Sequence, residues 1–384
     1  MADEYSTKGL PPAPAVSMRT IPMAGLLVDV YGLDELPPAE TGAPLTCLWL
    51  LHPRTRTRAR MADIARRTIY AWNESPLRQQ QQQQQCQHGQ GSSSFSSSTT
   101  TTAAATTASS GHGHDHGKRP RGLIALAFDM PNHGSREVSA AANQSWAGGN
   151  AQHALDMAGM VRGAAADAGF LMEVVGAYVG REGCVDAHVA LGWSLGGHAA
   201  WQAVVGEDRV DAAVVVIGCP DLLGLLTDRA SKANLDTGGR PLLGSKYLPP
   251  SLIRSLAHHD PRAILFGGAP GASGEAPVPT PPLDPTERER LRPLLDRHLR
   301  GKKVLLCSGG ADELVPHART RPVAAVLEDA ARGWYADGGL EVRDAVYEGV
   351  GHHFSAGMVG DAVEFLVRAV AAGPRARGGV RASS

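Results

Sequence analysis

The sequence has almost no net charge and no long apolar run, and each shortage excludes a class of protein. Lysine and arginine together number 37, against 38 aspartate and glutamate residues, so the formal net charge is −1. A chain with this balance has no bulk electrostatic attraction to nucleic acid or to an acidic membrane surface. No apolar run approaches the roughly 20 residues of a membrane-spanning helix. We therefore expect neither a nucleic-acid partner nor a membrane span.

Cysteine is also scarce, with five residues scattered along the chain and no Cys-x-x-Cys pair. Free thiols in a reducing compartment fit this set better than a disulfide framework does. The first residues (MADEYSTKGLPPAPAVSM) carry acidic residues and prolines where a signal peptide needs a basic end and an apolar core. We expect a soluble, cytoplasmic protein.

Residues 78–118 interrupt an otherwise ordinary globular composition. Residues 79–85 are all glutamine, and serine, threonine and alanine tracts follow before GHGHDHG. Such a segment buries too little apolar surface to offset the entropy of ordering it, so we expect a disordered insertion. Its histidines, His112, His114 and His116, bind metal only adventitiously in this interpretation, and we expect no metal site and no cofactor.

Apolar runs alternate with stretches of helical spacing on both sides of this insertion. The runs lie at residues 46–51, 123–128, 188–191, 210–217, 304–307 and 341–347. Continuous apolar runs are typical of buried parallel strands. The alternation predicts an α/β fold with a mostly parallel sheet covered on both faces. Residues 21–30, with a partner beyond Tyr31, are expected to add antiparallel edge strands.

The region between the fourth and fifth runs is rich in proline, glycine and short helical pieces. We interpret it as a cap at the edge of the sheet where the strands end, because loops at this edge build the sites of α/β proteins. The predicted organisation is a flexible N-terminus (1–20), a core (21–220) holding the insertion, a cap (221–302), a second part of the core (303–372) and a flexible tail (373–384).

The stretch HVALGWSLGGHAAW sets Ser194 between Gly192 and Gly196, where a strand becomes a helix. A G-x-S-x-G sequence in this context predicts a nucleophile elbow, a tight turn that lifts the serine oxygen above the sheet. Side chains at the two glycine positions would collide with neighbouring backbone. The following helix directs its positive end at the serine.

A serine hydroxyl becomes a nucleophile only when a base takes its proton and an acid orients that base. In chain order, Asp312 follows the fifth run, and His352 follows the sixth run and precedes the last helix. These positions predict a Ser194-Asp312-His352 triad. Asp221 is an alternative acid, and His353 is an alternative base.

A developing oxyanion needs two N–H donors. The backbone N–H of Leu195 is the expected first donor. Pro53 has no N–H, so Arg54 is the expected second donor, with Thr55 as the alternative. We expect His52 to turn the chain and Trp193 and Trp201 to pack. Arg136 and Glu137 are expected to form structural ion pairs, with an Arg136 contact to a substrate carboxylate as the alternative.

With these residues in view, the sequence resembles serine hydrolases of the α/β-hydrolase fold over about residues 45–372. Residues 122–135 (GLIALAFDMPNHGS) are similar to that fold's D-x-x-G-H-G-x-S turn, with Asn132 replacing the first glycine. HPR at 52–54 departs from the usual His-Gly. The sequences NHGSRE and IGCPD, and the spacing N-x-x-W-x-x-G-N-x-x-H-x-x-D-M at 143–157, resemble fungal members with no assigned substrate.

The resemblance implies hydrolysis of a small-molecule carboxylic ester through an acyl-enzyme, without metal or organic cofactor. A serine peptidase or thioesterase of the same fold is the alternative within this chemistry. A non-catalytic ligand receptor is the alternative in a different class, because a fold does not determine a function.

Overall fold

The structure is a computed structural model that describes residues 9–81, 83, 120–267 and 277–376 of the 384-residue chain. Within these residues, eight strands form one sheet in the order β1-β2-β4-β3-β5-β6-β7-β8. The six strands from β4 to β8 in this order are parallel, and β1 and β2 are antiparallel additions at one edge. The strands are β1 (Met18–Met23), β2 (Leu26–Tyr31), β3 (Leu45–Leu51), β4 (Gly122–Phe128), β5 (Val185–Trp193), β6 (Val210–Val216), β7 (Lys303–Gly309) and β8 (Glu341–Tyr347).

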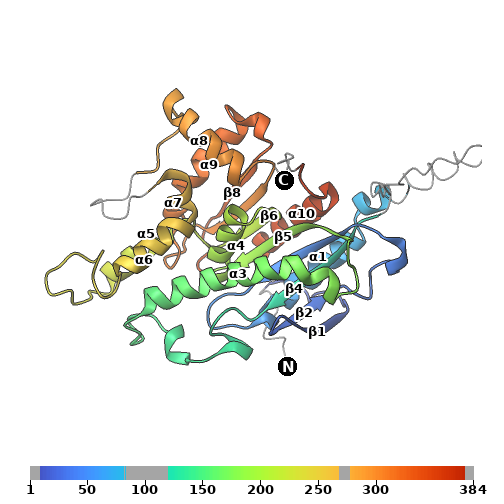
Figure 1. The fold of residues 1–384 in the computed structure, drawn as a ribbon, viewed down its shortest axis with the longest axis horizontal. Coiled ribbons are helices and arrows are strands. Elements are labelled where there is room, and N and C mark those ends of the chain that lie inside the picture. The colour runs from blue at the N-terminus through green and yellow to red at the C-terminus, as the bar shows by residue number, and fades with distance from the viewer. Residues whose placement is uncertain (1–8, 82, 84–119, 268–276, 377–384) are drawn as a thin grey trace, which may run out of the picture.

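Helices cover both faces of the sheet, because the central strands alternate their apolar side chains between two cores. On β3, Cys47 and Trp49 pack into one core, and Leu48 and Leu50 pack into the other. The first core is closed by helices that include α3 (His153–Tyr178), α4 (Leu195–Gly206) and α9 (Arg321–Arg332), and the second by α1 (Ala62–Asn73) and α10 (Ala356–Ala372). Figure 1 shows the long α3 lying across the front of the sheet. The predicted fold class is confirmed.

The edge strands differ from the prediction, which paired residues 21–30 with a partner beyond Tyr31. Both strands precede residue 32, and they turn at Ala24 and Gly25, whose φ angles are 50° and 82°. Two consecutive positive φ angles make the tight hairpin turn that matches strand twist. The apolar pattern runs through this turn, which is why it suggested a single strand.

The predicted flexible segments are shorter than expected where the structure describes them. β1 begins at Met18, inside the expected flexible N-terminus. Residues 76–81 are helical, and the Gln81 side chain accepts a hydrogen bond from the Arg121 N–H (3.3 Å) and donates one to Ala371 O (3.2 Å). Arg375, in the expected tail, donates its N–H to Asp211 Oδ1 at 3.1 Å. Most of the predicted insertion, with His112, His114 and His116, lies outside the described residues.

Four helices separate β6 from β7, in the region predicted to form a cap. They are α5 (Leu222–Lys232), α6 (Pro250–His259), α7 (Pro261–Phe266) and α8 (Pro285–His298). In Figure 1 they lie at the left of the molecule, far from the β1–β2 hairpin. The helical region therefore begins directly after β6, the strand that pairs with β5.

Candidate active site

Ser194 lies on a strained turn between β5 and α4. Its φ and ψ angles are 54° and −111°, outside the regions that residues with a side chain usually occupy. A Cβ on Gly192 would lie 1.9 Å from Gly196 O, and a Cβ on Gly196 would lie 2.0 Å from Leu51 O. Glycine is therefore required at both positions, because any side chain would force the strand, the turn and β3 apart.

The fold brings Ser194, His352 and Asp312 into one chain of hydrogen bonds. The Ser194 hydroxyl donates to His352 Nε2 at 2.8 Å, across 158 residues of sequence. His352 Nδ1 donates to Asp312 Oδ2, also at 2.8 Å. This arrangement selects the imidazole tautomer whose Nε2 has a free lone pair for the serine proton.

Asp312 is held as a carboxylate by the loop that follows β7. Asp312 is only 4% exposed. Its Oδ1 accepts hydrogen bonds from the N–H groups of Leu314 and Val315, both at 2.9 Å. Burial acts to raise the pKa of Asp312, but the hydrogen bond and charge of His352 and the two backbone N–H groups outweigh it. The net pKa lies below the ordinary 3.8. Asp312 therefore stays ionised and faces the imidazole as an acceptor.

The two alternative residues have other partners or positions. Asp221 caps the N-terminus of α5 by accepting Gly224 N–H at 3.0 Å, and it pairs with Arg319 at 3.1 Å. His353 is exposed, whereas its neighbour His352 is turned toward Ser194. Of these alternatives, the structure brings neither to the serine hydroxyl.

The expected oxyanion donors lie on the two segments that meet at Ser194. Leu195 opens α4, and Arg54 follows β3, whose last residue, Leu51, packs against Gly196. In the described part of the chain, no hydrogen bond occupies the backbone N–H of Leu195 or Arg54. Both N–H groups are thus available to a ligand oxygen. Thr55, the alternative donor, is exposed, with a φ of 62°.

His52 holds the backbone between β3 and β4. Its Nε2 accepts Met130 N–H at 2.9 Å, and its Nδ1 donates to Pro53 O at 2.8 Å. Burial is the main cause that lowers the pKa of His52 to about 4, so the ring is neutral at pH 7. This agrees with its expected role in turning the chain.

Arg136 is engaged by protein groups. It pairs with Asp167 on α3 at 2.7 Å and donates to Asp129 O at 3.0 Å. The same Asp129 accepts the N–H and hydroxyl of Ser135, which ties the NHGS turn to β4. Arg136 therefore follows the structural interpretation.

The two tryptophans differ in their surroundings. Trp201 is fully buried and packs in the core beneath α4. Trp193, next to the serine, meets Phe354 edge-on at a ring distance of 5.6 Å and carries the Arg60 guanidinium 4.7 Å above its ring. Trp193 therefore links the serine turn to the loop that carries His352.

Arg229, which the sequence analysis did not single out, also lies at this edge. It is a half-buried residue of α5, and its Nη2 donates to Leu314 O, two residues from Asp312, at 2.7 Å. The one signal in the sequence is a positive charge within the apolar stretch LLGLLTDRA. Helical spacing alone does not distinguish such a residue from an ordinary surface arginine.

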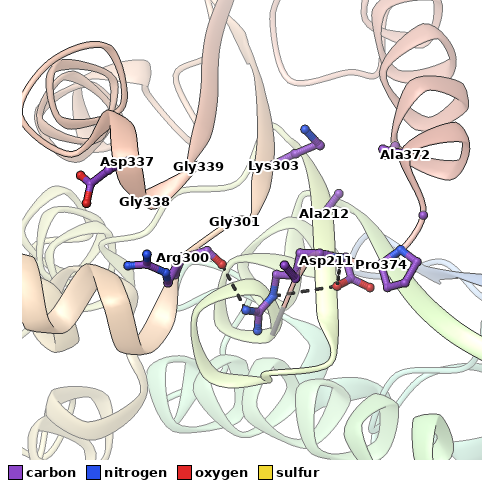
Figure 2. A pocket seen from close by; sticks show the side chains of 14 residues that line it. Asp211, Ala212, Arg300, Gly301, Lys303, Asp337, Gly338, Gly339, Ala372 and Pro374 are labelled. Carbon is purple, nitrogen blue, oxygen red and sulfur yellow. Dashed lines mark hydrogen bonds and ion pairs between the residues drawn. The ribbon is translucent and has the colours of Figure 1, made fainter. Parts of the chain in front are cut away.

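A separate pocket of about 400 Å³ lies at the opposite edge of the sheet, where β6 and β7 begin (Figure 2). Its positive side chains are already paired: Arg300 with Asp296 at 2.6 Å, Arg375 with Asp208 at 2.7 Å, and Lys303 with Glu341.

In the described ranges, no cluster of three or more histidine, cysteine or acidic side chains is arranged to hold a metal ion. None of the described helices has the length and apolar character needed to cross a bilayer.

These observations define the fold. A mostly parallel sheet carries a serine elbow between a strand and a helix, and an acid and a histidine follow in that order after later strands. The chain has the α/β-hydrolase fold.

Known proteins resemble this chain in structure only. No protein-family model and no curated protein sequence matches the chain. Among solved structures, it is similar to TT1662 from Thermus thermophilus, with 17% identity, a TM-score of 0.49, and coverage of 93% of this chain and 99% of the other. A 2,6-dihydroxy-pseudo-oxynicotine hydrolase is 14% identical, with a TM-score of 0.43 and coverage of 97% of this chain and 72% of the other. An esterase from Pyrococcus furiosus is 14% identical, with a TM-score of 0.39 and coverage of 92% of each chain.

Proposed function

We propose that the protein is a serine hydrolase that cleaves a carboxylic ester through an acyl-enzyme intermediate. The observation that carries this proposal is the pair of 2.8 Å hydrogen bonds that join Ser194 to His352 and His352 to Asp312. Acyl transfer requires a serine, an imidazole that accepts its proton, and a carboxylate that orients the imidazole, and these three groups are joined here.

In the proposed reaction, Ser194 Oγ attacks the ester carbonyl while His352 Nε2 takes the hydroxyl proton. The N–H groups of Leu195 and Arg54 stabilise the oxyanion, and His352 returns its proton to the departing alcohol. Water then attacks the acyl-enzyme with His352 again as the base, which releases the acid and restores Ser194. Asp312 holds the tautomer and stabilises the imidazolium throughout. Apart from the attacking water, the proposed chemistry uses side chains and backbone of this protein.

Active-site labelling tests the nucleophile. A fluorophosphonate probe is expected to modify the folded wild-type protein at Ser194, as read by mass spectrometry of the labelled peptide. Ser194→Ala is expected to lose labelling and to reduce kcat/KM for a short-chain aryl ester by about 10⁴-fold or more, because no other group can accept the acyl chain. Its thermal unfolding temperature should stay within a few degrees of the wild type.

The same assay separates the ester proposal from its alternatives. The wild-type protein is offered matched acyl groups as an aryl ester, a thioester and an aminoacyl amide. Ester turnover supports the proposal, and turnover of the thioester or the amide alone would reassign the substrate class. An unlabelled Ser194 in folded protein would instead favour a non-catalytic receptor.

A further inference from the structure

Two arginines at the carboxyl edge of the sheet have no acidic partner within the described part of the chain. Arg54 follows β3, and Arg229 lies on α5 above the Asp312 loop. Both are half-buried, and among the described residues no carboxylate lies within ion-pair distance of either guanidinium. Burial alone accounts for the lowered pKa of Arg54, which is the behaviour of a cation without a counter-ion.

The guanidinium of Arg229 retains free hydrogen-bonding capacity. Its Nη2 donates to Leu314 O at 2.7 Å, its Nη1 lies 3.4 Å from the sulfur of Met157, and its Nε is buried without a partner. Burial is the main cause that lowers the pKa of Arg229 to about 10. The charge of Arg54 lowers it further, and the charge of Asp312 opposes this.

Arg54 contacts the segment that leads into α3. Its Nη1 donates to Asn143 O at 3.1 Å, the one hydrogen bond found on this guanidinium in the described ranges. The positive charges of Arg54 and Arg229 both lower the pKa of His153, after the larger effect of burial. Arg54 contacts Asn143, in the segment before α3, and Arg229 contacts Met157, near the first turn of α3, so both guanidinium groups lie at the same end of this helix.

Two other half-buried arginines of this protein are placed differently. Arg58 pairs with Asp29 at 3.0 Å and with Asp129, and Arg319 pairs with Asp221 and Asp228. Removing a guanidinium from water without an anionic partner costs several kcal/mol, and a second nearby cation adds repulsion. An anion bound to both guanidinium groups would offset the desolvation cost and the repulsion together. Unpaired cations near a proposed nucleophile therefore indicate a binding role.

We propose that Arg54 and Arg229 bind an anionic group of the substrate, so that the preferred ester carries a carboxylate or phosphate a few bonds from the scissile carbonyl. This inference rests on the proposed hydrolase function. Planar guanidinium groups match the oxygen spacing of both anions and hold them by charge-assisted hydrogen bonds. Because Arg54 is also the proposed oxyanion donor through its backbone, one residue aligns the anionic end and the reacting carbonyl.

The first experiment compares charged and neutral esters on the wild-type enzyme. Monoethyl esters of dicarboxylic acids with three to six carbons are hydrolysed in a pH-stat, each against the ethyl ester in which a methyl group replaces the free carboxylate. We expect kcat/KM to favour the charged ester by about 10-fold or more at one chain length, the range of one or two charge-assisted hydrogen bonds. Ethyl 4-phosphonobutanoate, compared with monoethyl glutarate, distinguishes a phosphate-type anion from a carboxylate.

Variants then assign the preference to the two side chains. Arg229→Gln and Arg54→Gln are each expected to lower the charged-to-neutral ratio by about 10-fold, and Arg229→Lys to retain part of it. The control is Arg254→Gln, which removes one positive charge from an exposed position on α6 and should leave the ratio unchanged. Thermal unfolding of every variant identifies any that misfold. Equal ratios in Arg229→Gln and wild type would overturn the assignment.

A binding measurement keeps this inference separate from the proposed reaction. Calorimetry with Ser194→Ala and glutarate needs no turnover, and we expect binding that weakens about 10-fold when Arg229→Gln is added. Ester turnover with no charge preference and no glutarate binding would overturn the arginine proposal and leave the hydrolase proposal standing. No labelling and no turnover, with glutarate still bound through Arg229, would overturn the hydrolase proposal alone.

Discussion

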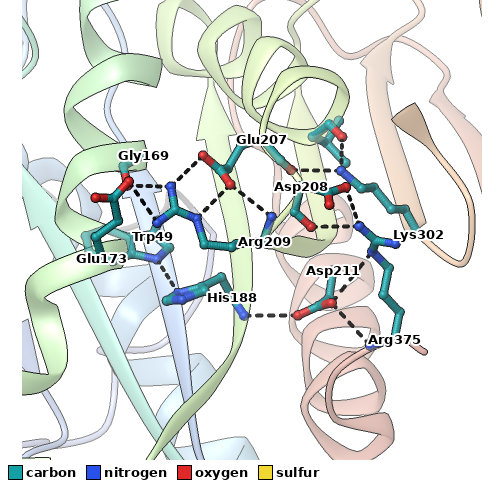
Figure 3. Close-up of polar contacts among 11 residues, drawn as sticks. Trp49, Gly169, Glu173, His188, Glu207, Asp208, Arg209, Asp211, Lys302 and Arg375 are labelled. Atoms are coloured by element: carbon teal, nitrogen blue, oxygen red, sulfur yellow. Dashed lines mark hydrogen bonds and ion pairs between the residues drawn. The ribbon is translucent and has the colours of Figure 1, made fainter. Parts of the chain in front are cut away.

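Arginines at the two edges of the parallel sheet differ in their partners. At the edge where the strands begin, Arg209 is held by Glu207 at 2.8 Å and by Glu173 at 3.2 Å, and Arg375 is held by Asp208 at 2.7 Å (Figure 3). At the edge where the strands end, Arg54 and Arg229 have no carboxylate partner among the described residues.

The strain of the backbone follows the same division. Ser194, at the carboxyl edge, has the unfavourable φ of 54°. At the amino edge, buried Lys302 directs its ammonium at two carbonyl oxygens, Val204 O at 2.7 Å and Glu207 O at 2.8 Å, where α4 ends. Helix α4 thus begins directly after the strained Ser194, and carbonyl groups at its other end accept hydrogen bonds from Lys302. The strained serine therefore lies at the edge where chemistry is proposed.

Replacing the carboxylate of Asp312 by an amide is expected to have the largest effect, a loss of activity. Asp312→Asn should lower kcat/KM by about 10³- to 10⁴-fold with little change in stability, because the amide favours the wrong imidazole tautomer. Steady-state ester hydrolysis and urea unfolding measure the two quantities. The matched control is Asp221→Asn, which should lower the free energy of unfolding by about 1 kcal/mol through loss of its ion pair with Arg319 and leave most activity. A reversal of these two outcomes would exchange the roles of the two acids.

Acid should destabilise the protein mainly through buried histidines. Burial is the largest cause that lowers the pKa of His52 and His153 to about 4 and of His198 to about 3. Their stability contribution is complete above the unfolded pKa of about 6.5. It is lost as the pH falls from there toward 4, because only the unfolded chain takes up these protons.

Each such histidine lowers the free energy of unfolding by up to about 1.4 kcal/mol per pH unit. The measurement is urea unfolding between pH 7 and pH 5. His198→Gln should have a shallower slope than the wild type, and His353→Gln, at an exposed position, should keep the wild-type slope. Equal slopes for all three proteins would contradict the assignment to His198.

The smallest effect should come from exchanging a paired and an unpaired arginine for glutamine. Arg209→Gln should lower the free energy of unfolding by about 1–2 kcal/mol, because Glu207 loses its partner. Arg229→Gln should leave that free energy unchanged or raise it, because a cation without a counter-ion is removed. Chemical denaturation of both variants tests the contrast, and equal destabilisation would show that Arg229 serves stability as Arg209 does.

The turn at Ser194 depends on local backbone, which the sequence can indicate. The turn at Ser194 needs Gly192 and Gly196 within a few residues, and the apolar run before it needs only neighbouring side chains. The β1–β2 hairpin was missed because Ala24 and Gly25 interrupt no apolar pattern. Arg229 was missed because its importance lies in what it does not contact, a property that the sequence does not carry.

By itself, the sequence determined the alternation of strands and helices, the serine turn and the order in which Ser194, Asp312 and His352 occur. Burial pattern and glycine placement are local properties, so they can be predicted from neighbouring residues. Only the tertiary structure decided that His352, rather than His353, meets a serine 158 residues away. It also decided that Arg54 and Arg229 lie at this edge with no carboxylate partner among the residues described. The reason is geometric: side-chain direction and charge pairing depend on which distant segments the packed sheet brings together.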